Sequence, residues 1–151
     1  MIRFETITED NWRPGLTVFE EQKHWVSDTF EILARAYAYR SCRPHVYLIC
    51  DDTLLDEDGD PTPVGMVLYH DCDAMQGYDF SQLFIDRRYQ GRGYGKRASA
   101  MILDEMRRDG KYHKVVLCYI EGNTAAKHLY ASLGFTETDH DGDEIIMELY
   151  L

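Results

Sequence analysis

The residue types most suited to chemistry lie together in one stretch, Gln82 to Arg97. Its first part, Leu83-Phe84-Ile85, is apolar, has good strand propensity and predicts a buried strand. Its second part is rich in glycine and basic residues: Gln90, Gly91, Arg92, Gly93, Tyr94, Gly95 and Lys96. Glycine lets a backbone approach a ligand closely, and the first N–H groups of a helix have no partner within the helix. The stretch therefore predicts a strand, a turn and a helix start that together bind an anion.

The distribution of charge supports an anion site at this turn. Residues 87–114 hold nine of the chain's sixteen Lys and Arg and only three acidic residues, whereas the whole chain has a net charge of −11. Local positive charge of this kind attracts a polyphosphate. The glycine spacing matches neither the G-x-G-x-x-G of dinucleotide-binding folds nor the loop of kinase-type nucleotide sites. The alternative is a tight strand–helix junction whose arginines are simply solvated.

Periodicity and turn residues predict the elements that must position this stretch. Apolar patterns predict strands at 2–7, 46–50, 64–69, 78–86 and 115–119, and a final hairpin of 135–138 and 145–150. Helical spacing predicts helices from Thr8 or Pro14, from His24 to Tyr39, at 93–108 and from Asn123. This order predicts the α/β (α+β) class, with one mixed, mostly antiparallel central sheet of about seven strands and helices on both faces.

Length and composition limit the class of protein. The 151 residues predict a single domain over 1–151, with 44% hydrophobic and 28% charged residues. There is no apolar run long enough to span a bilayer and no signal-peptide core at the N-terminus, so neither a membrane nor export is expected. The four cysteines form no C-x-x-C pair, which predicts a cytoplasmic protein with reduced thiols and no metal cluster.

Two acidic segments, 51–60 and 137–148, hold twelve of the 27 acidic residues. Neither has the spacing of a calcium loop, so both are interpreted as solvated hairpin loops rather than metal sites. The net negative charge also argues against non-specific binding of nucleic acid.

Two sequence blocks resemble the GNAT acetyltransferase superfamily. Gln90-x-x-Gly93-x-Gly95 resembles its Q/R-x-x-G-x-G/A signature, and the segment from Asn123 through Tyr130 to Phe135 resembles its N-x-x-A-x-x-x-Y…G-F block. The order of predicted elements is also similar. The resemblance implies the GNAT fold, acetyl-CoA as co-substrate without a metal, and transfer of acetyl to an amine.

The resemblance also implies roles for particular residues. Tyr130 would be the acid that protonates the departing thiolate, although a helical tyrosine of this kind is commonly a core residue. Asn123 would contact the cofactor or cap its helix, and Lys127 would reach a phosphate or be solvated. The remaining residues of the cofactor site would be Leu83, Phe84, Ile85, Gln90, Gly91, Arg92, Gly93, Tyr94, Gly95 and Lys96.

A finer resemblance to bacterial spermine/spermidine acetyltransferases rests on Glu20 to Val26, Leu33 to Tyr37, Pro63 to Val67 and Tyr89 to Gly95. It implies a small polyamine-like acceptor, and the resemblance to the family as a whole implies a homodimer. Asp79 and Gln82 depart from the aromatic and basic residues that are usual in those relatives. The alternatives are another amine, such as a peptide, an amino acid or an aminoglycoside, and a non-catalytic acyl-CoA-binding module.

The acceptor site and the general base are less well defined by the sequence. Glu20, Glu21, Asp28 and Glu31 on the N-terminal helices would line an acidic acceptor groove or form a solvated helix face, with Asp79 and Gln82 nearby. The identity of the general base stays open. The alternatives are a base that acts through water at Asp79, at Tyr78 or at a backbone carbonyl, and Glu121. His24, His70 and His128 are expected to be exposed or fully hydrogen-bonded.

Overall fold

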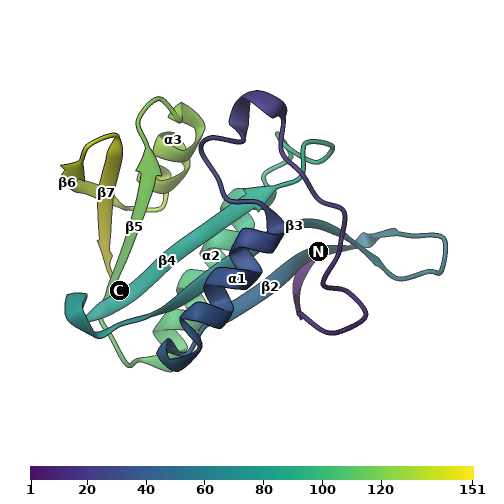
Figure 1. Cartoon of the computed structure of the whole chain (residues 1–151), viewed down its shortest axis with the longest axis horizontal. Helices are drawn as coiled ribbons and strands as arrows, with labels where there is room; N and C mark the ends of the chain where they lie inside the picture. Colours follow the sequence, from purple (N-terminus) through teal and green to yellow (C-terminus); the bar gives the residue numbers. More distant parts are fainter.

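A computed structural model describes all residues 1–151 and contains one seven-stranded sheet (Figure 1). The strands run in the order β1-β2-β3-β4-β5-β7-β6, and every neighbouring pair is antiparallel except β4 and β5. Their bounds are β1 Ile2–Thr6, β2 His45–Leu55, β3 Pro61–Cys72, β4 Gly77–Ile85, β5 Lys114–Ile120, β6 Thr136–Asp141 and β7 Glu144–Tyr150. The predicted mixed, mostly antiparallel sheet of seven strands is confirmed.

Three α-helices cover the two faces of the sheet. Helix α1 (Thr29–Ala38) packs Ile32 and Ala36 against Met66 and Phe84 on one face. Helices α2 (Tyr94–Asp109) and α3 (Thr124–Ser132) belong to a larger core on the other face. None of the helices combines the length and the apolar composition that crossing a membrane requires. The predicted arrangement with helices on both faces is confirmed.

The sheet is weakly joined at its centre. Strands β4 and β5 pair only through Tyr78 with Val115 and Asp79 with Val116, and beyond this point they separate (Figure 1). In β4 the register against β3 also shifts, because Leu68 pairs with Gln82 while Tyr69 pairs with Phe80. Ser81 is therefore the extra residue of a β-bulge, which bends a strand and re-aims its backbone groups. The free edge of β4 begins next to this bulge.

The N-terminal region differs from the prediction. No helix begins at Thr8 or Pro14, and residues 12–19 are irregular, with Gly15 at a φ of +70°. The helix expected from His24 begins at Thr29, because the Asp28 carboxylate accepts a hydrogen bond from Glu31 N–H at 2.8 Å and caps it there. Only a single 3₁₀ turn, η1 (Glu20–Gln22), precedes α1 among the predicted helical residues. The segment between β1 and α1 therefore crosses the sheet as an irregular strap.

Candidate active site

Asp86, directly after β4, fixes the turn that leads to α2. Its carboxylate is buried and accepts hydrogen bonds from Thr17 N–H at 2.9 Å, Arg88 N–H at 2.9 Å and Arg88 Nε at 2.8 Å. Burial by itself raises the pKa of Asp86, but the hydrogen bonds from Arg88 and Thr17 outweigh it and lower the pKa. The carboxylate thus ties the turn to the N-terminal strap.

The glycines leave backbone amides of the turn open. Gly91 and Gly93 have φ angles of +76° and +82°, in the left-handed region that favours glycine. Gly93 is the N-cap of α2, and no side chain caps this helix. The first N–H groups of α2 therefore have neither a helical partner nor a side-chain partner, which is the arrangement that binds phosphate.

Several side chains of the turn have structural contacts of their own. Gln90 Nε2 donates to the Ile85 carbonyl at 3.0 Å and pairs with the Gln22 side-chain amide on the strap. The Tyr94 ring is buried, and its hydroxyl donates to Asp51. Arg92 and Arg97 are exposed and donate to backbone carbonyls of the same turn. The side chains of Gln90 and Tyr94 therefore already have hydrogen-bond partners, and these two residues can bind a ligand only through their backbone groups.

A cavity of about 400 Å³ extends from this turn along β4. We call it the donor cavity, after the acetyl donor that the sequence resemblance implies. The predicted strand residues Leu83, Phe84 and Ile85 all line it, as do residues of α3 and of the strap. Of the predicted cofactor residues, those that line it are Leu83, Phe84, Ile85, Gln90, Gly91, Gly93, Tyr94, Gly95, Lys96 and Asn123. Arg92 and Lys127 do not, and Lys127 Nζ lies 3.9 Å from the Glu137 carboxylate instead.

Tyr130 lies at the inner end of the donor cavity. Its side chain is 8% exposed, and its ring is held edge-on by Phe80 and Phe135, with centroid distances of 6.0 and 5.8 Å. Burial raises the pKa of Tyr130, so the hydroxyl stays protonated near neutral pH and can donate a proton. Asn123 caps α3 by accepting from Ala126 N–H at 3.2 Å, which confirms the capping alternative for this residue.

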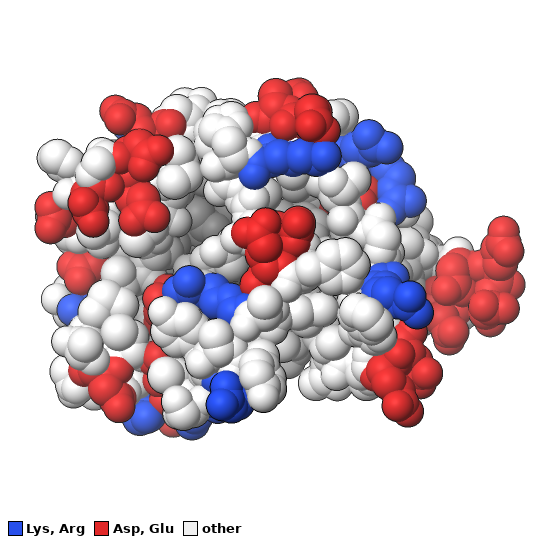
Figure 2. Space-filling view, viewed as in Figure 1, with Lys and Arg blue, Asp and Glu red and all other residues white.

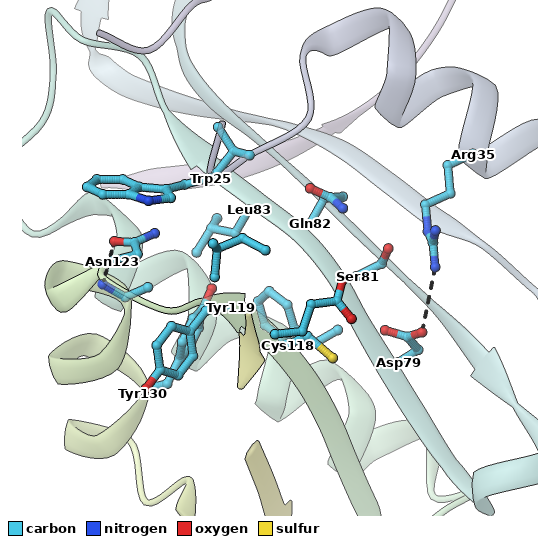
Figure 3. Close-up of a pocket in the computed structure, with 15 residues that line it drawn as sticks. Trp25, Arg35, Asp79, Ser81, Gln82, Leu83, Cys118, Tyr119, Asn123 and Tyr130 are labelled. Carbon is cyan, nitrogen blue, oxygen red and sulfur yellow. Dashed lines mark hydrogen bonds and ion pairs between the residues drawn. The ribbon is translucent and has the colours of Figure 1, made fainter. Parts of the chain in front are cut away.

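An acceptor cavity of about 290 Å³ adjoins the donor cavity (Figure 3). Asp79, Ser81 and Gln82 of β4 form one side, and Arg35 of α1 and Cys118 of β5 lie across from them. The two cavities share six lining residues: Trp25, Val26, Leu83, Asn123, Ala126 and Tyr130. A group bound in one cavity therefore meets a group bound in the other beside Leu83 and Tyr130.

Asp79 is the carboxylate that β4 contributes to the acceptor cavity. Its Oδ2 lies 3.8 Å from Arg35 on α1 and 3.8 Å from His70 on β3. Burial raises the pKa of Asp79, against the opposing effect of the neighbouring His70 and Arg35 side chains. Tyr78, the neighbouring candidate for a base, is turned away, because its hydroxyl donates to Asp109 and accepts from Lys111 N–H at 3.1 Å.

The four predicted acidic residues of the N-terminal region lie outside the acceptor cavity. Glu20 and Glu21 are exposed, and Glu20 pairs with Lys23 at 2.7 Å. Asp28 and Glu31 line a separate cavity of about 380 Å³ between the strap and Phe84. Gln82 does line the acceptor cavity, and its Oε1 accepts from Ser27 N–H at 3.5 Å. Figure 2 shows acidic side chains on both sides of the hollow, over the β6–β7 hairpin on one side and over the start of α1 on the other.

Sequence reasoning did not find several residues of the acceptor cavity. Trp25 and Arg35 belong to a region in which the helix boundary was wrong, so neither could be placed. Ser81 occupies a bulge that no sequence pattern indicates. Cys118 follows a strand pattern that indicates burial, yet the separation of β4 from β5 leaves it exposed.

Comparisons with known proteins agree with this geometry. A family model described as "Acetyltransferase (GNAT) family" matches residues 4–135. The chain is 31% identical over 70 residues to a spermine/spermidine N(1)-acetyltransferase of Bacillus subtilis, covering 44% of this chain and 46% of that protein. It is 32% identical over 78 residues to an L-methionine sulfoximine/L-methionine sulfone acetyltransferase of Salmonella typhimurium, covering 49% and 44%. The chain thus spans about half the length of the curated relatives it matches.

The fold comparison extends over the whole chain. A structure of spermidine N-acetyltransferase from Vibrio cholerae, in complex with CoA and spermine, superposes with a TM-score of 0.70 at 17% identity and covers 99% of this chain and 94% of that one. At this identity the likeness shows the fold alone. Because the family model matches residues 4–135, which is most of the chain, the chain belongs to the acetyltransferase (GNAT) family.

Proposed function

We propose that the protein transfers an acetyl group from acetyl-CoA to a primary amine of a small polyamine-like molecule. The observation that supports this most strongly is the meeting of two cavities beside Tyr130. One of them ends at an uncapped helix N-terminus suited to a polyphosphate, and the other contains the half-buried carboxylate of Asp79, which is suited to an amine. A donor and an acceptor would approach each other only where the cavities join.

The donor cavity suits the shape and charge of acetyl-CoA. The open amides from Gly91 to Lys96 would hold the pyrophosphate, and the pantetheine arm would lie along the free edge of β4. Backbone groups of Leu83, Phe84 and Ile85 would contact that arm and the thioester carbonyl. An N–H on this edge would stabilise the oxyanion that forms on attack.

The reaction then needs three proton transfers, because two protons leave the acceptor nitrogen and one goes to the sulfur. An ammonium has no lone pair and an alkyl ammonium has a pKa of about 10, so the acceptor must first lose a proton, here to Asp79 directly or through a water. The amine nitrogen then bonds to the thioester carbon and gives its second proton to water, and the C–S bond breaks as the intermediate collapses. The departing sulfur takes a proton from the Tyr130 hydroxyl, and the products are an N-acetyl amine and CoA.

A polyamine acceptor is supported by charge as well as by the relatives. Asp79 and Glu144 line the acceptor cavity, and the chain as a whole has a net charge of −11, which attracts cations. The curated relative from Bacillus subtilis and the structural neighbour from Vibrio cholerae are both named for polyamines. A homodimer and a cytoplasmic location stay predictions.

An amino acid is the second candidate acceptor, because of Arg35. This side chain lines the acceptor cavity, and its buried Nε has no hydrogen-bond partner. A guanidinium with free donors suits the carboxylate of an amino acid. The relative from Salmonella typhimurium is named for two amino-acid analogues.

The test is release of thiol from acetyl-CoA with a panel of amines: spermine, spermidine, putrescine, lysine, methionine sulfoximine, N-terminal peptides and aminoglycosides. Fastest turnover with spermine or spermidine is the expected result. Turnover with amino acids alone, weakened in Arg35→Gln through a higher KM, would favour the second candidate. Acetyl-CoA binding without turnover on any amine would contradict the proposed activity and favour a binding module.

A further inference from the structure

His70 is a buried histidine that the chemistry described above does not use. It lies on β3, is 1% exposed, and its Nδ1 lies 2.9 Å from the backbone carbonyl of Asp71. Because a carbonyl oxygen only accepts, Nδ1 carries the proton and donates it. In the neutral ring Nε2 then carries a lone pair, yet Nε2 is buried and has no hydrogen-bond partner. An unpaired buried polar atom destabilises the folded state, so its presence calls for an explanation.

The unpaired nitrogen faces the carboxylate of the acceptor cavity. His70 and Asp79 are direct cross-strand partners on β3 and β4, and Nε2 lies 3.8 Å from Asp79 Oδ2. Asp79 lines the cavity, whereas His70 does not. The His70 imidazole therefore does not line the acceptor cavity, and the Asp79 carboxylate lies between it and a bound acceptor amine.

Tyr39 holds both neighbours of Asp79 in place. The His70 ring stacks on Tyr39 with centroids 4.5 Å apart and an interplanar angle of 19°, and the Arg35 guanidinium lies 4.7 Å from the centroid of the same ring. Both side chains then reach the same oxygen of Asp79. The other titratable side chains that line the same cavity are Cys118 and Tyr119 on β5, Tyr130 on α3 and Glu144 on β7.

We propose that His70 is a positioning residue that stores the proton which Asp79 removes from the acceptor ammonium. The proposal rests on the proposed acetyl transfer. The N–H bond of the ammonium breaks and its proton goes to Asp79 Oδ2. From there the proton moves to the lone pair of Nε2, which makes an imidazolium and restores the carboxylate. A separation of 3.8 Å exceeds a hydrogen bond, so this second transfer needs a small rotation of the carboxyl group or one water.

The proton relay lets Asp79 accept a proton and then become anionic again by passing that proton to His70, which a lone carboxylate could not do. A carboxyl group is a weak base towards an ammonium, whereas an imidazole exchanges protons near neutral pH. With the proton on His70, Asp79 is again anionic and continues to orient the amine. After release of CoA and product, the proton returns through Asp79 and restores Tyr130 by way of solvent.

The test compares His70→Asn with Asp79→Asn in two measurements. Asparagine at 70 keeps a donor towards the Asp71 carbonyl and removes the group that faces Asp79. We expect kcat/KM for the best amine to fall about tenfold at pH 7 in H70N, with the acid limb of its pH profile moved to lower pH. The matched control is H45N, because His45 also stacks on a tyrosine, Tyr69, at 4.5 Å but lies away from the cavities.

The second measurement does not depend on activity. The ¹⁵N signal of His70 Nε2 is followed against pH in the parent and in D79N, where we expect the transition to move to lower pH because the imidazolium loses its carboxylate. An unchanged transition in D79N, or an H70N pH profile that matches the parent, would overturn the relay. A moved transition in a protein that acetylates no amine would leave the coupled pair intact and refute the proposed function instead. Should H70N fail to fold, the D79N titration decides alone.

Discussion

Tyr130→Phe is the most specific substitution in the site, because it removes only the hydroxyl oxygen and keeps the ring. The edge contacts to Phe80 and Phe135 involve only the ring and are retained. Burial is the sole cause of the raised pKa of Tyr130, with no hydrogen bond contributing, so removing the hydroxyl leaves no donor or acceptor unpaired. We therefore expect the free energy of unfolding to change by less than about 0.5 kcal/mol.

The expected effect on turnover is much larger. A positioned general acid contributes about 10²- to 10⁴-fold, which corresponds to roughly 2.7–5.4 kcal/mol at 1.36 kcal/mol per tenfold. We expect kcat to fall by that amount while the Kd for acetyl-CoA, measured by calorimetry, stays within twofold of the parent.

Tyr47→Phe is the matched control for Tyr130→Phe. It removes a hydroxyl that donates to Glu105 at 2.6 Å, away from both cavities, and we expect it to cost about 1 kcal/mol of stability without affecting kcat. If Y130F turned over as fast as the parent with normal acetyl-CoA binding, the role of Tyr130 as an acid would be wrong.

Three further perturbations test the scaffold. Gly93→Ala places a Cβ at a φ of +82°, costs about 1–2 kcal/mol in strain and should weaken acetyl-CoA binding, whereas Gly142→Ala at +61° in the β6–β7 turn should cost similar stability and leave that Kd unchanged. Equal Kd values for both variants would remove the turn from the cofactor site. Gly65→Ala would place a Cβ against the Phe84 carbonyl, so we expect β4 to shift and the urea midpoint to fall clearly; an unchanged midpoint would show that the strand contact is not tight. Hydrogen bonds from Thr53 and Tyr94 lower the pKa of Asp51 from 3.8 to about 2. The folded pKa is thus below the unfolded one, so its contribution is present above pH 4 and is lost as pH falls towards 2. Urea midpoints from pH 7 to 2 should show that decline, and a decline that begins near pH 6 would contradict the assignment.

The turn and its flanking elements could be predicted from sequence because their signals are local. Leu83 to Ile85 are apolar and consecutive, the glycines mark left-handed backbone, and the apolar face of α2 repeats from Tyr94 through Ala98 to Met106. Each of these signals lies within a few residues of the structure that it specifies. The two blocks that resemble the family lie in the same well-patterned part of the chain.

The acceptor cavity could not be predicted because it is assembled from distant segments. Arg35, Asp79 and Cys118 meet only when α1 packs across a sheet whose strands separate at β4 and β5. The strap before α1 has no periodicity, since it is held by single contacts such as the bond from Thr17 N–H to Asp86. The pairing of His70 with Asp79 depends on the register of β3 against β4, which the bulge at Ser81 shifts by one residue.

The narrow junction between β4 and β5 has a consequence for how the protein is maintained in a cell. Two residue pairs join β1–β4 to β5–β7 within the sheet, so the two parts rely on the α2 and α3 packing and on whatever fills the gap. A molecule that binds across the gap in the folded state raises the free energy of unfolding by RT ln(1 + [L]/Kd), which is about 2.7 kcal/mol at one hundred times Kd. If acetyl-CoA is that molecule, as proposed above, the resistance of the folded chain to proteolysis would rise with the concentration of acetyl-CoA.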